Sequence, residues 1–337
     1  PAARPVFGKS QLEFLTTPGA IKMYGRYIVL FAILFTGWFL RKINFIDDKM
    51  NHSINKLIVY FAYPCLIVHN IGSMEATGKV LLSFLITFVL SLALFFLYGF
   101  VSRLYAKARK FPESEANVLE FAMASPNNGF MGFPVALIFF GDMGLLLMLA
   151  HNAAMNFFFF TYGIGLLRRN CRDKRKATPG RMFKAVLKLL VNPNILALFI
   201  GFAISLLGGN IPGPLDDYLL YLGNISTPMA MIFIGSNLVN YKFSDIIKSL
   251  TVIESSLMKL VWLPALTGVL VYFLPLSSLI KSILVLGACF PTAATVSMLA
   301  EQEGLDPGPA SKVLFLSTVA SIATVPAAIN LINMIFV

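Results

Sequence analysis

The sequence predicts an all-α membrane protein with ten transmembrane helices, and the composition is the first reason. Of its 337 residues, 57% are hydrophobic and 13% are charged, whereas a soluble domain carries about 25% charged residues. The hydrophobic residues also form long continuous runs, and a membrane β-barrel would instead show alternating apolar and polar residues. These features exclude an ordinary soluble enzyme, a disordered chain and a disulfide scaffold.

Ten apolar runs are long enough to cross a bilayer, which takes about 20 residues in a helix. The predicted helices, numbered 1 to 10, are 21–40, 50–73, 78–102, 114–141, 143–167, 183–208, 215–239, 244–274, 278–301 and 308–336. Residues 1–20 are interpreted as an N-terminal tail. A basic segment, 168–182, separates five helices in residues 21–167 from five more in residues 183–337.

Basic residues gather in the connections that follow odd-numbered helices. They are Arg41, Lys42, Lys49, Arg103, Lys107, Arg109, Lys110, Arg168, Arg169, Arg172, Lys174, Arg175, Lys176, Arg181, Lys184, Lys188, Lys242 and Lys248. The connections after even-numbered helices hold Lys79 and Lys281 alone. Because cytoplasmic loops are enriched in Lys and Arg, we expect a multi-pass protein of the cell membrane. Segment 168–182 would lie in the cytoplasm, and both termini would lie on the extracellular or periplasmic side.

The net charge of +11 has the same explanation. Cytoplasmic loops and contacts with anionic lipid account for it, so membrane lipid is an expected partner and no nucleic acid is predicted to bind.

The two sets of five helices are interpreted as an inverted repeat. Because five is an odd number, two copies that are read in the same direction have opposite orientations in the membrane, as in many secondary transporters. Corresponding residues lie 164 or 165 positions apart: Pro64 and Pro228, Pro126 and Pro291, Asn152 and Ser317, and Asn156 and Ser321. The last two matches place two polar groups, spaced i and i+4, on one face of helix 5 and of helix 10.

Helices 4 and 9 are each interrupted by residues that disfavour a continuous helix. Helix 4 contains Ser-Pro-Asn-Asn-Gly-Phe-Met-Gly-Phe-Pro at 125–134, and helix 9 contains Gly-Ala-Cys-Phe-Pro-Thr-Ala-Ala-Thr at 287–295. Backbone groups freed by such breaks cannot face lipid. We therefore predict that the two broken helices cross near the middle of the bilayer, where the N-termini of the half-helices would favour an anion.

Residues at the breaks, with polar residues of helices 2 and 5, are the candidates for substrate binding. These candidates are Asn127, Asn128, Gly129, Thr292, Ala293, Thr295, Asn152, Asn156, Asn70 and Ser73. The prolines expected to shape the crossing and the kinks are Pro126, Pro134, Pro291, Pro64 and Pro228. The structural alternative is a pair of simple proline kinks packed between neighbouring helices.

Three ionisable residues inside the helices are candidates for ion coupling. Glu120 lies seven residues before Asn127, on the same helix face, and either couples protons or cations or pairs with a base near the membrane surface. Lys259 either attracts an anion, or gates transport, or pairs with a neighbouring carboxylate. His151 either takes part in coupling or forms a hydrogen bond between helices.

The break in helix 4 resembles that of the auxin efflux carrier family, which includes PIN-type plant carriers and bacterial dicarboxylate permeases. The matching features are the run Ser125–Pro134 and the stretch from Pro291 to Ser311, in which Ala300, Leu305 and Pro307 also match. Pro126, Asn127 and Pro291 stand at the crossover positions of the family. Asn128 departs from the pattern, because PIN-type carriers typically have threonine there, so a preference for auxin does not carry over.

The resemblance implies a fold similar to that of sodium/proton antiporters and bile-acid symporters. Helices 1, 2, 6 and 7 would form a scaffold and the contact of a homodimer. Helices 3–5 and 8–10 would form a transport domain that moves as an elevator and carries the substrate at the crossing of helices 4 and 9.

The expected function is secondary transport of small organic anions, carboxylates above all. Coupling to protons, sodium or the membrane potential stays open. The alternative is a sodium-coupled symporter of the bile-acid type, which would need carboxylate and amide oxygens around a hard cation; helix 9 contains neither an acidic residue nor glutamine between Ser277 and Ala300. A membrane enzyme is disfavoured because the sequence has no nucleophile elbow and no HExxH motif. No cofactor or metal site is predicted.

Overall fold

Helices form all the regular elements of the residues that the computed structural model describes. These residues are 18–74, 77–170, 191–208, 211–239, 246 and 248–336. The all-α class predicted from the sequence is therefore confirmed for the described part of the chain. Residues 1–17 of the predicted tail and residues 171–182 of the basic segment lie outside it.

The first half of the chain contains eleven helical elements in its described residues. They are α2 (Pro18–Lys42), α3 (Asp48–Leu57), η1 (Ile58–Ala62), α4 (Tyr63–Gly72), α5 (Gly78–Ala108), α6 (Glu113–Ala124), η2 (Asn128–Gly132), α7 (Phe133–Phe158), η3 (Phe159–Gly163), α8 (Ile164–Leu167) and η4 (Arg168–Asn170). Elements η1, η2 and η3 are single π-helical turns within longer helices. The Thr77 side chain accepts a hydrogen bond from the Val80 N–H, 3.4 Å away, and so begins α5.

The second half of the described chain is also helical. Its elements are α10 (Pro193–Leu206), α11 (Gly213–Asn224), α12 (Ser226–Leu238), α14 (Leu250–Leu257), η5 (Met258–Trp262), α15 (Leu263–Tyr272), α16 (Ser278–Cys289), α17 (Thr295–Gln302) and α18 (Gly308–Phe336). Each predicted apolar run thus contains helix. Within α7, Gly141 has a φ of +64°, a conformation that glycine adopts readily, and this bend lies between predicted helices 4 and 5.

Six helical segments of the described residues are long and apolar enough to cross a membrane. They are Asp48–Gly72, Gly78–Ala108, Asn128–Leu167, Gly213–Leu238, Leu250–Tyr272 and Gly308–Phe336. Two apolar helices, Pro193–Leu206 and Ser278–Cys289, are shorter. The arrangement of ten crossings as an inverted repeat stays a prediction.

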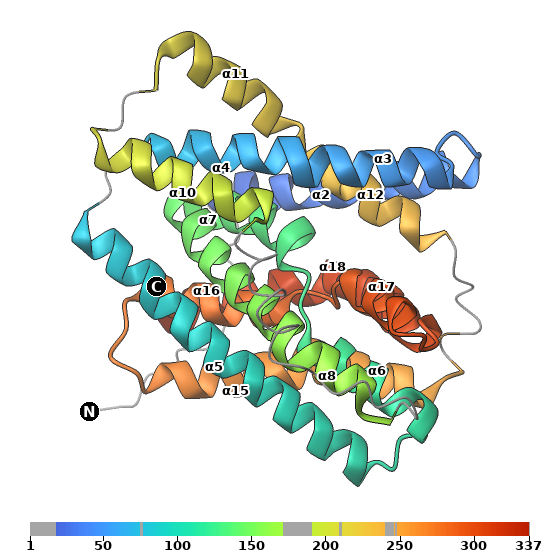
Figure 1. The fold of residues 1–337 in the computed structure, drawn as a ribbon. Helices are drawn as coiled ribbons and strands as arrows, with labels where there is room; N and C mark the ends of the chain where they lie inside the picture. The colour runs from blue at the N-terminus through green and yellow to red at the C-terminus, as the bar shows by residue number, and fades with distance from the viewer. Residues whose placement is uncertain are drawn as a thin grey trace.

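The helices lie in two layers (Figure 1). One layer contains α2, α3, α4, α10, α11 and α12, and the other contains α5, α6, α8 and α14 to α18. Helix α7 packs mainly against α5 and α16 and also contacts α2 and α4. We call the first layer the scaffold layer and the second, together with η2 and α7, the crossover layer.

Glycine allows the closest approach of helices within the scaffold layer. A Cβ atom added at Gly37 of α2 would lie 2.3 Å from the carbonyl oxygen of Ile232 in α12, and one added at Gly235 would lie 1.8 Å from that of Leu34. On α10, a Cβ atom added at Gly201 would lie 2.9 Å from Ile71 of α4. Small residues at such contacts are typical of membrane helices, because they let two backbones pack closely.

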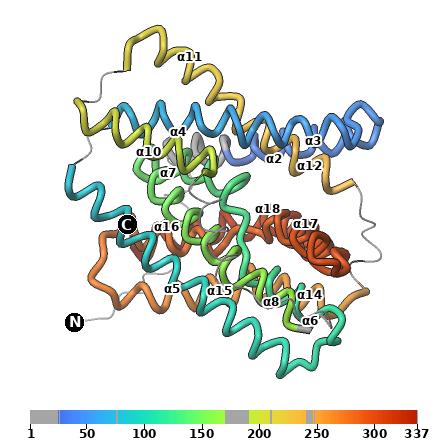
Figure 2. Tube along the Cα trace, viewed as in Figure 1, coloured from blue at the N-terminus to red at the C-terminus, as the bar shows by residue number. Residues whose placement is uncertain are grey.

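Basic residues gather at one end of the two layers. Figure 2 shows that the α2–α3, α5–α6 and α17–α18 connections lie at one end, and that the α10–α11 and α15–α16 connections lie at the other with the C-terminus. Arginines of the first end form ion pairs with glutamates: Arg109 with Glu254, Arg168 with Glu303, and Arg169 with Glu120. Hydrogen bonding to Glu254 raises the pKa of the Arg109 guanidinium.

Candidate functional site

Two helices are broken and restart a few residues later. Helix α6 ends at Ala124, Ser125 is extended, and the π-helical turn η2 begins at Asn128. Helix α16 ends at Cys289, Phe290 is extended, and α17 begins at Thr295. We call residues 125–127 and 290–294 together the crossover.

Main-chain hydrogen bonds join the two breaks in antiparallel orientation. The Asn127 N–H donates to the Pro291 carbonyl at 2.7 Å, and the Ala293 N–H donates to the Ser125 carbonyl at 2.9 Å. Pro126 and Thr292 form the isolated bridge between them. The breaks thus satisfy one another's backbone groups, which is required where water is absent.

Side chains strengthen this crossing from both directions. The Thr292 hydroxyl donates to the Ala122 carbonyl at 2.9 Å, at the C-terminal end of α6. The Thr292 N–H donates to the Ser317 hydroxyl of α18 at 3.1 Å. Thr292 is fully buried, so the structure uses this predicted substrate-binding residue to hold the crossover together.

Asn127 lies at the N-terminus of a half-helix. Its side-chain oxygen accepts a 3.3 Å hydrogen bond from the Phe130 N–H and so caps η2. The other half-helix, α17, follows Ala294 and has no side-chain cap. Uncapped N–H groups and the positive end of the helix dipole favour an anion at this end.

A small cavity lies where the crossover meets the scaffold layer. Its lining residues are Asn127, Phe130, Phe233, Ile234, Asn237, Leu238, Ala294 and Leu314, and we call it the crossover cavity. Its volume is about 10 Å³, which is close to the space that one water molecule needs. The rings of Phe130 and Phe233 lie 4.9 Å apart between centroids, so the two layers are in contact here and the cavity is closed to a carboxylate.

Most residues of this region were not among the predicted site residues, and four of these are aromatic or polar. Phe130, Phe233 and Asn237 line the cavity, and the Tyr63 hydroxyl donates to the Gly129 carbonyl at 2.8 Å. Phe130 stands inside the break motif, and Asn237 follows Phe233 by one helical turn. Tyr63 directly precedes the predicted Pro64, so its position beside a kink was the available signal.

Asn128 points to a different part of the site from its neighbour. Its side-chain nitrogen donates to Nδ1 of His151 at 2.8 Å, and both side chains are fully buried. His151 also packs against the Phe95 ring and against Gly287, where an added Cβ atom would lie 2.5 Å from the imidazole. Among the described residues, the Asn128 Oδ1 and His151 Nε2 atoms have no hydrogen-bond partner.

Lys259 lies beside the second break, at the end of α16. Its ammonium donates to the Ala288 carbonyl at 2.8 Å, and its side chain is fully buried. Ala288 stands in the last turn of α16, where the helix dipole is negative. The lysine therefore places its side-chain nitrogen at the C-terminal end of the broken helix.

Glu120 forms a bidentate ion pair with Arg169. The two guanidinium nitrogens lie 2.9 and 2.8 Å from its carboxylate oxygens, and Arg169 also donates to Asn117 at 2.6 Å. Glu120 is 1% exposed. Of the two interpretations of Glu120, this geometry supports pairing with a base.

Asn152 and Asn156 do not line the crossover cavity. They line a second cavity of about 10 Å³ together with Asn192 and Asn194, between α7 and α10. Thr295 begins α17 and is exposed. Asn70 and Ser73 lie at the C-terminal end of α4, and neither lines the crossover cavity.

The predicted prolines stand where helices bend or restart. Pro126 and Pro291 lie in the crossover. Pro64 and Pro134 stand in the first turn of α4 and α7, directly after the π-helical turns η1 and η2. Pro228 stands in the first turn of α12. The last three prolines lie within helical segments that continue through them, Asp48–Gly72, Asn128–Leu167 and Gly213–Leu238. The missing N–H therefore interrupts the regular helical bonding and favours a local bend or a π-helical turn.

Comparisons with known proteins agree that this chain is similar to membrane transporters. Residues 23–329 match the family described as membrane transport protein. The chain is 27% identical over 318 residues to a candidate malonate transporter of Rhizobium meliloti, covering 92% of this chain and 95% of the relative. It is 23% identical over 297 residues to an uncharacterized transporter of Methanothermobacter thermautotrophicus, covering 88% and 93% of the two chains. An uncharacterized transporter of Methanocaldococcus jannaschii is 22% identical over 303 residues, with 88% and 95% covered.

Proposed function

Because the chain belongs to the membrane transport protein family, the auxin efflux carrier family, we propose that it is a secondary transporter of small organic anions. Carboxylates, and short dicarboxylates in particular, are the proposed substrates. The relative from Rhizobium meliloti that is named for malonate supports this class of substrate.

The observation that carries the proposal is the position of Asn127. It stands at the N-terminus of a half-helix, in a cavity that it shares with Ala294 at the uncapped start of α17. A carboxylate in this cavity would accept hydrogen bonds from backbone N–H groups and from side-chain amides, in the field of two helix dipoles. Asn237 of α12 would contribute a second side-chain amide from the scaffold layer.

An elevator movement would open the cavity. The closed contact between Phe130 and Phe233 joins the crossover layer to the scaffold layer. If the crossover layer slides against the scaffold layer, this contact separates, and the cavity faces one side of the membrane and then the other. The inverted repeat is supported by Gly37 and Gly201, which lie 164 residues apart and each stand at a close helix contact of the scaffold layer.

Lys259 and His151 are the proposed coupling residues. Lys259 would place a positive charge at the end of α16, and its bond to the Ala288 carbonyl links that charge to the crossover. We propose that the basic end of the layers faces the cytoplasm and that the scaffold helices form the contact of a homodimer.

The experiment is uptake of radiolabelled malonate into liposomes that contain the purified protein. We expect uptake in wild type and a loss of at least tenfold in Asn127→Ala. The control is Asn55→Ala on α3, a helix that contributes no residue to the crossover cavity. Equal uptake by wild type and Asn127→Ala would contradict the proposed site, and absence of uptake for every organic anion would contradict the proposed substrate class.

A further inference from the structure

A much larger hollow than either cavity described above lies on the outside of the crossover layer. It has a volume of about 680 Å³ and lies between α15, α16 and α18, and we call it the outer groove. Ligand pockets of 300–1,000 Å³ are typical of sites for small molecules. The crossover cavity, at about 10 Å³, is separate from it and shares no lining residue with it.

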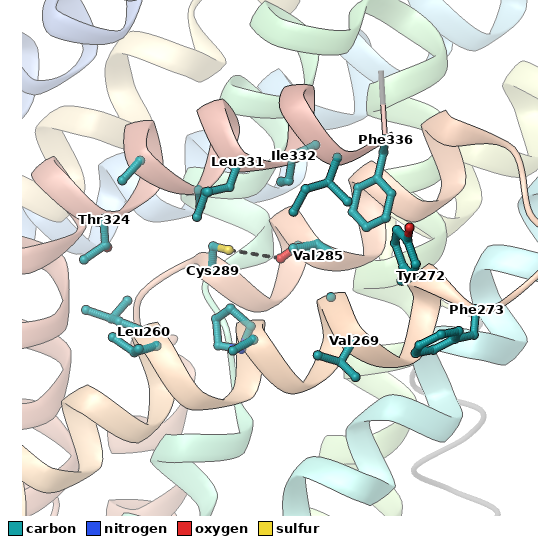
Figure 3. Close-up of a pocket in the computed structure, with 17 residues that line it drawn as sticks. Leu260, Val269, Tyr272, Phe273, Val285, Cys289, Thr324, Leu331, Ile332 and Phe336 are labelled. Atoms are coloured by element: carbon teal, nitrogen blue, oxygen red, sulfur yellow. Dashed lines mark hydrogen bonds between the residues drawn. The ribbon is translucent and has the colours of Figure 1, made fainter. Parts of the chain in front are cut away.

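The outer groove is lined almost entirely by apolar side chains. Figure 3 shows Leu331, Ile332 and Phe336 of α18 on one wall and Leu260 and Val269 on the opposite wall. Val285 and Cys289 of α16 form the floor, where the Cys289 thiol donates to the Val285 carbonyl.

The walls of the groove belong to membrane-spanning helices and open outward. Segments Leu250–Tyr272 and Gly308–Phe336 are both long and apolar enough to span a membrane. Val269 is 60% exposed and Leu331 is 56% exposed. In a bilayer these exposed side chains would face hydrocarbon, so an acyl chain could reach the groove without leaving the membrane.

One end of the groove carries a positive charge. Lys281 donates to the Tyr272 carbonyl at 3.1 Å, and its ammonium lies 5.9 Å from the centre of the Phe336 ring. Tyr272 and Phe336 both line the groove. An apolar groove that ends at an ammonium is complementary to an amphiphile that has an apolar chain and an anionic head.

We propose that the outer groove binds an anionic glycerophospholipid, with an acyl chain between α15 and α18 and the phosphate at Lys281. The groove floor connects this lipid to the crossover, because Leu260 and Cys289 directly adjoin Lys259 and Ala288, the two residues that form the bond at the end of α16. A bound chain would therefore hold α16 against α15.

The test is native mass spectrometry of the delipidated, full-length protein during titration with phosphatidylglycerol or phosphatidylcholine. We expect wild type to bind phosphatidylglycerol about fivefold more tightly than phosphatidylcholine, because one lysine near an anionic head contributes a preference of this size. Lys281→Gln should remove this preference and keep the binding of phosphatidylcholine. Lys79→Gln is the matched control, since Lys79 also follows an even-numbered helix, and it should behave as wild type.

A second variant fills the groove without disturbing the backbone. A Cβ atom at Gly268 would meet nothing within 4 Å, and Gly268 lines the groove, so Gly268→Leu should fold and should lower the binding of both lipids. Unchanged binding in Gly268→Leu, or an unchanged preference in Lys281→Gln, would overturn the proposal. A change of oligomeric state in Gly268→Leu would also overturn it, because the groove would then be covered by a second copy of the chain.

Discussion

The main-chain N–H of Asn127 donates a 2.7 Å hydrogen bond to the carbonyl of Pro291, 164 residues further along the chain. This bond and its counterpart from Ala293 to Ser125 hold two helix breaks against each other. Each half of the chain therefore supplies the partner for backbone groups that the other half leaves free. Neither break could satisfy these backbone groups without the other.

Thr292 provides the first test of this pairing. Replacing it by valine removes the hydroxyl that donates to the Ala122 carbonyl and keeps the shape of the side chain. Because the carbonyl then keeps only a long 3.4 Å hydrogen bond from the Ser125 N–H, we expect the free energy of unfolding to fall by about 1 kcal/mol. Thermal unfolding of the purified protein measures the loss.

Thr318→Val is the matched control for Thr292→Val. The Thr318 hydroxyl donates to the Leu314 carbonyl within its own helix, and that carbonyl can still be used in the helical hydrogen-bond pattern. We expect a smaller loss of stability there. If both variants unfold at the same temperature, the Thr292 hydroxyl does not hold the crossover together.

Lys259 separates a role in transport from a role in stability. Exchange of a buried charge for an apolar side chain of similar length is often neutral or stabilising, because the charge costs several kcal/mol to desolvate. We expect Lys259→Met to keep or raise the unfolding temperature and to lower malonate uptake at least tenfold. Uptake at the wild-type rate would limit Lys259 to packing against α16.

Glu120 and Arg169 should behave as a structural pair. Glu120 is 1% exposed and Arg169 is 27% exposed, so Glu120→Gln leaves a partly buried cation without its partner and should cost about 3 kcal/mol. The double variant Glu120→Gln with Arg169→Gln should recover part of this loss, whereas Lys107→Gln at the same end should change little. A shifted pH profile of uptake in Glu120→Gln would instead assign proton coupling to Glu120.

Gly235 tests the contact between α2 and α12. A methyl group at this position would lie 1.8 Å from a main-chain oxygen, and backbone has to move to make room. We expect Gly235→Ala to destabilise the protein by about 1–3 kcal/mol. Gly165→Ala is the control, since a Cβ atom there meets nothing within 4 Å, and an equal unfolding temperature for the two variants would refute the close contact.

Several features of the site could be read from the sequence because they are local. Proline and glycine interrupt an apolar helix by their own backbone chemistry, so the sequence predicts breaks within 125–134 and 287–295. The structure has them at the narrower segments 125–127 and 290–294. The helical class followed from the continuous apolar runs. Pro64 and Pro134 likewise directly follow π-helical turns, because proline interrupts the regular bonding of a helix.

Other features depend on how the two layers pack, and periodicity does not supply that. Asn127 and Asn128 are neighbours, yet the first lines the crossover cavity and the second bonds to His151. Asn156 lines a cavity against α10, and no pattern in helix 5 records which helix packs against this residue. The contact of Phe233 with Phe130 joins residues that are far apart in the sequence, so it required the fold.

Binding of an anion to the purified protein tests the central claim most directly. Unfolding temperatures would be measured with malonate and a panel of other small organic anions, with and without sodium, for wild type and Asn127→Ala. A ligand at 100 times its dissociation constant adds about 2.7 kcal/mol of apparent stability. Stabilisation of wild type that is lost in Asn127→Ala is the predicted result, and equal stabilisation of both proteins would contradict a substrate site at the crossover.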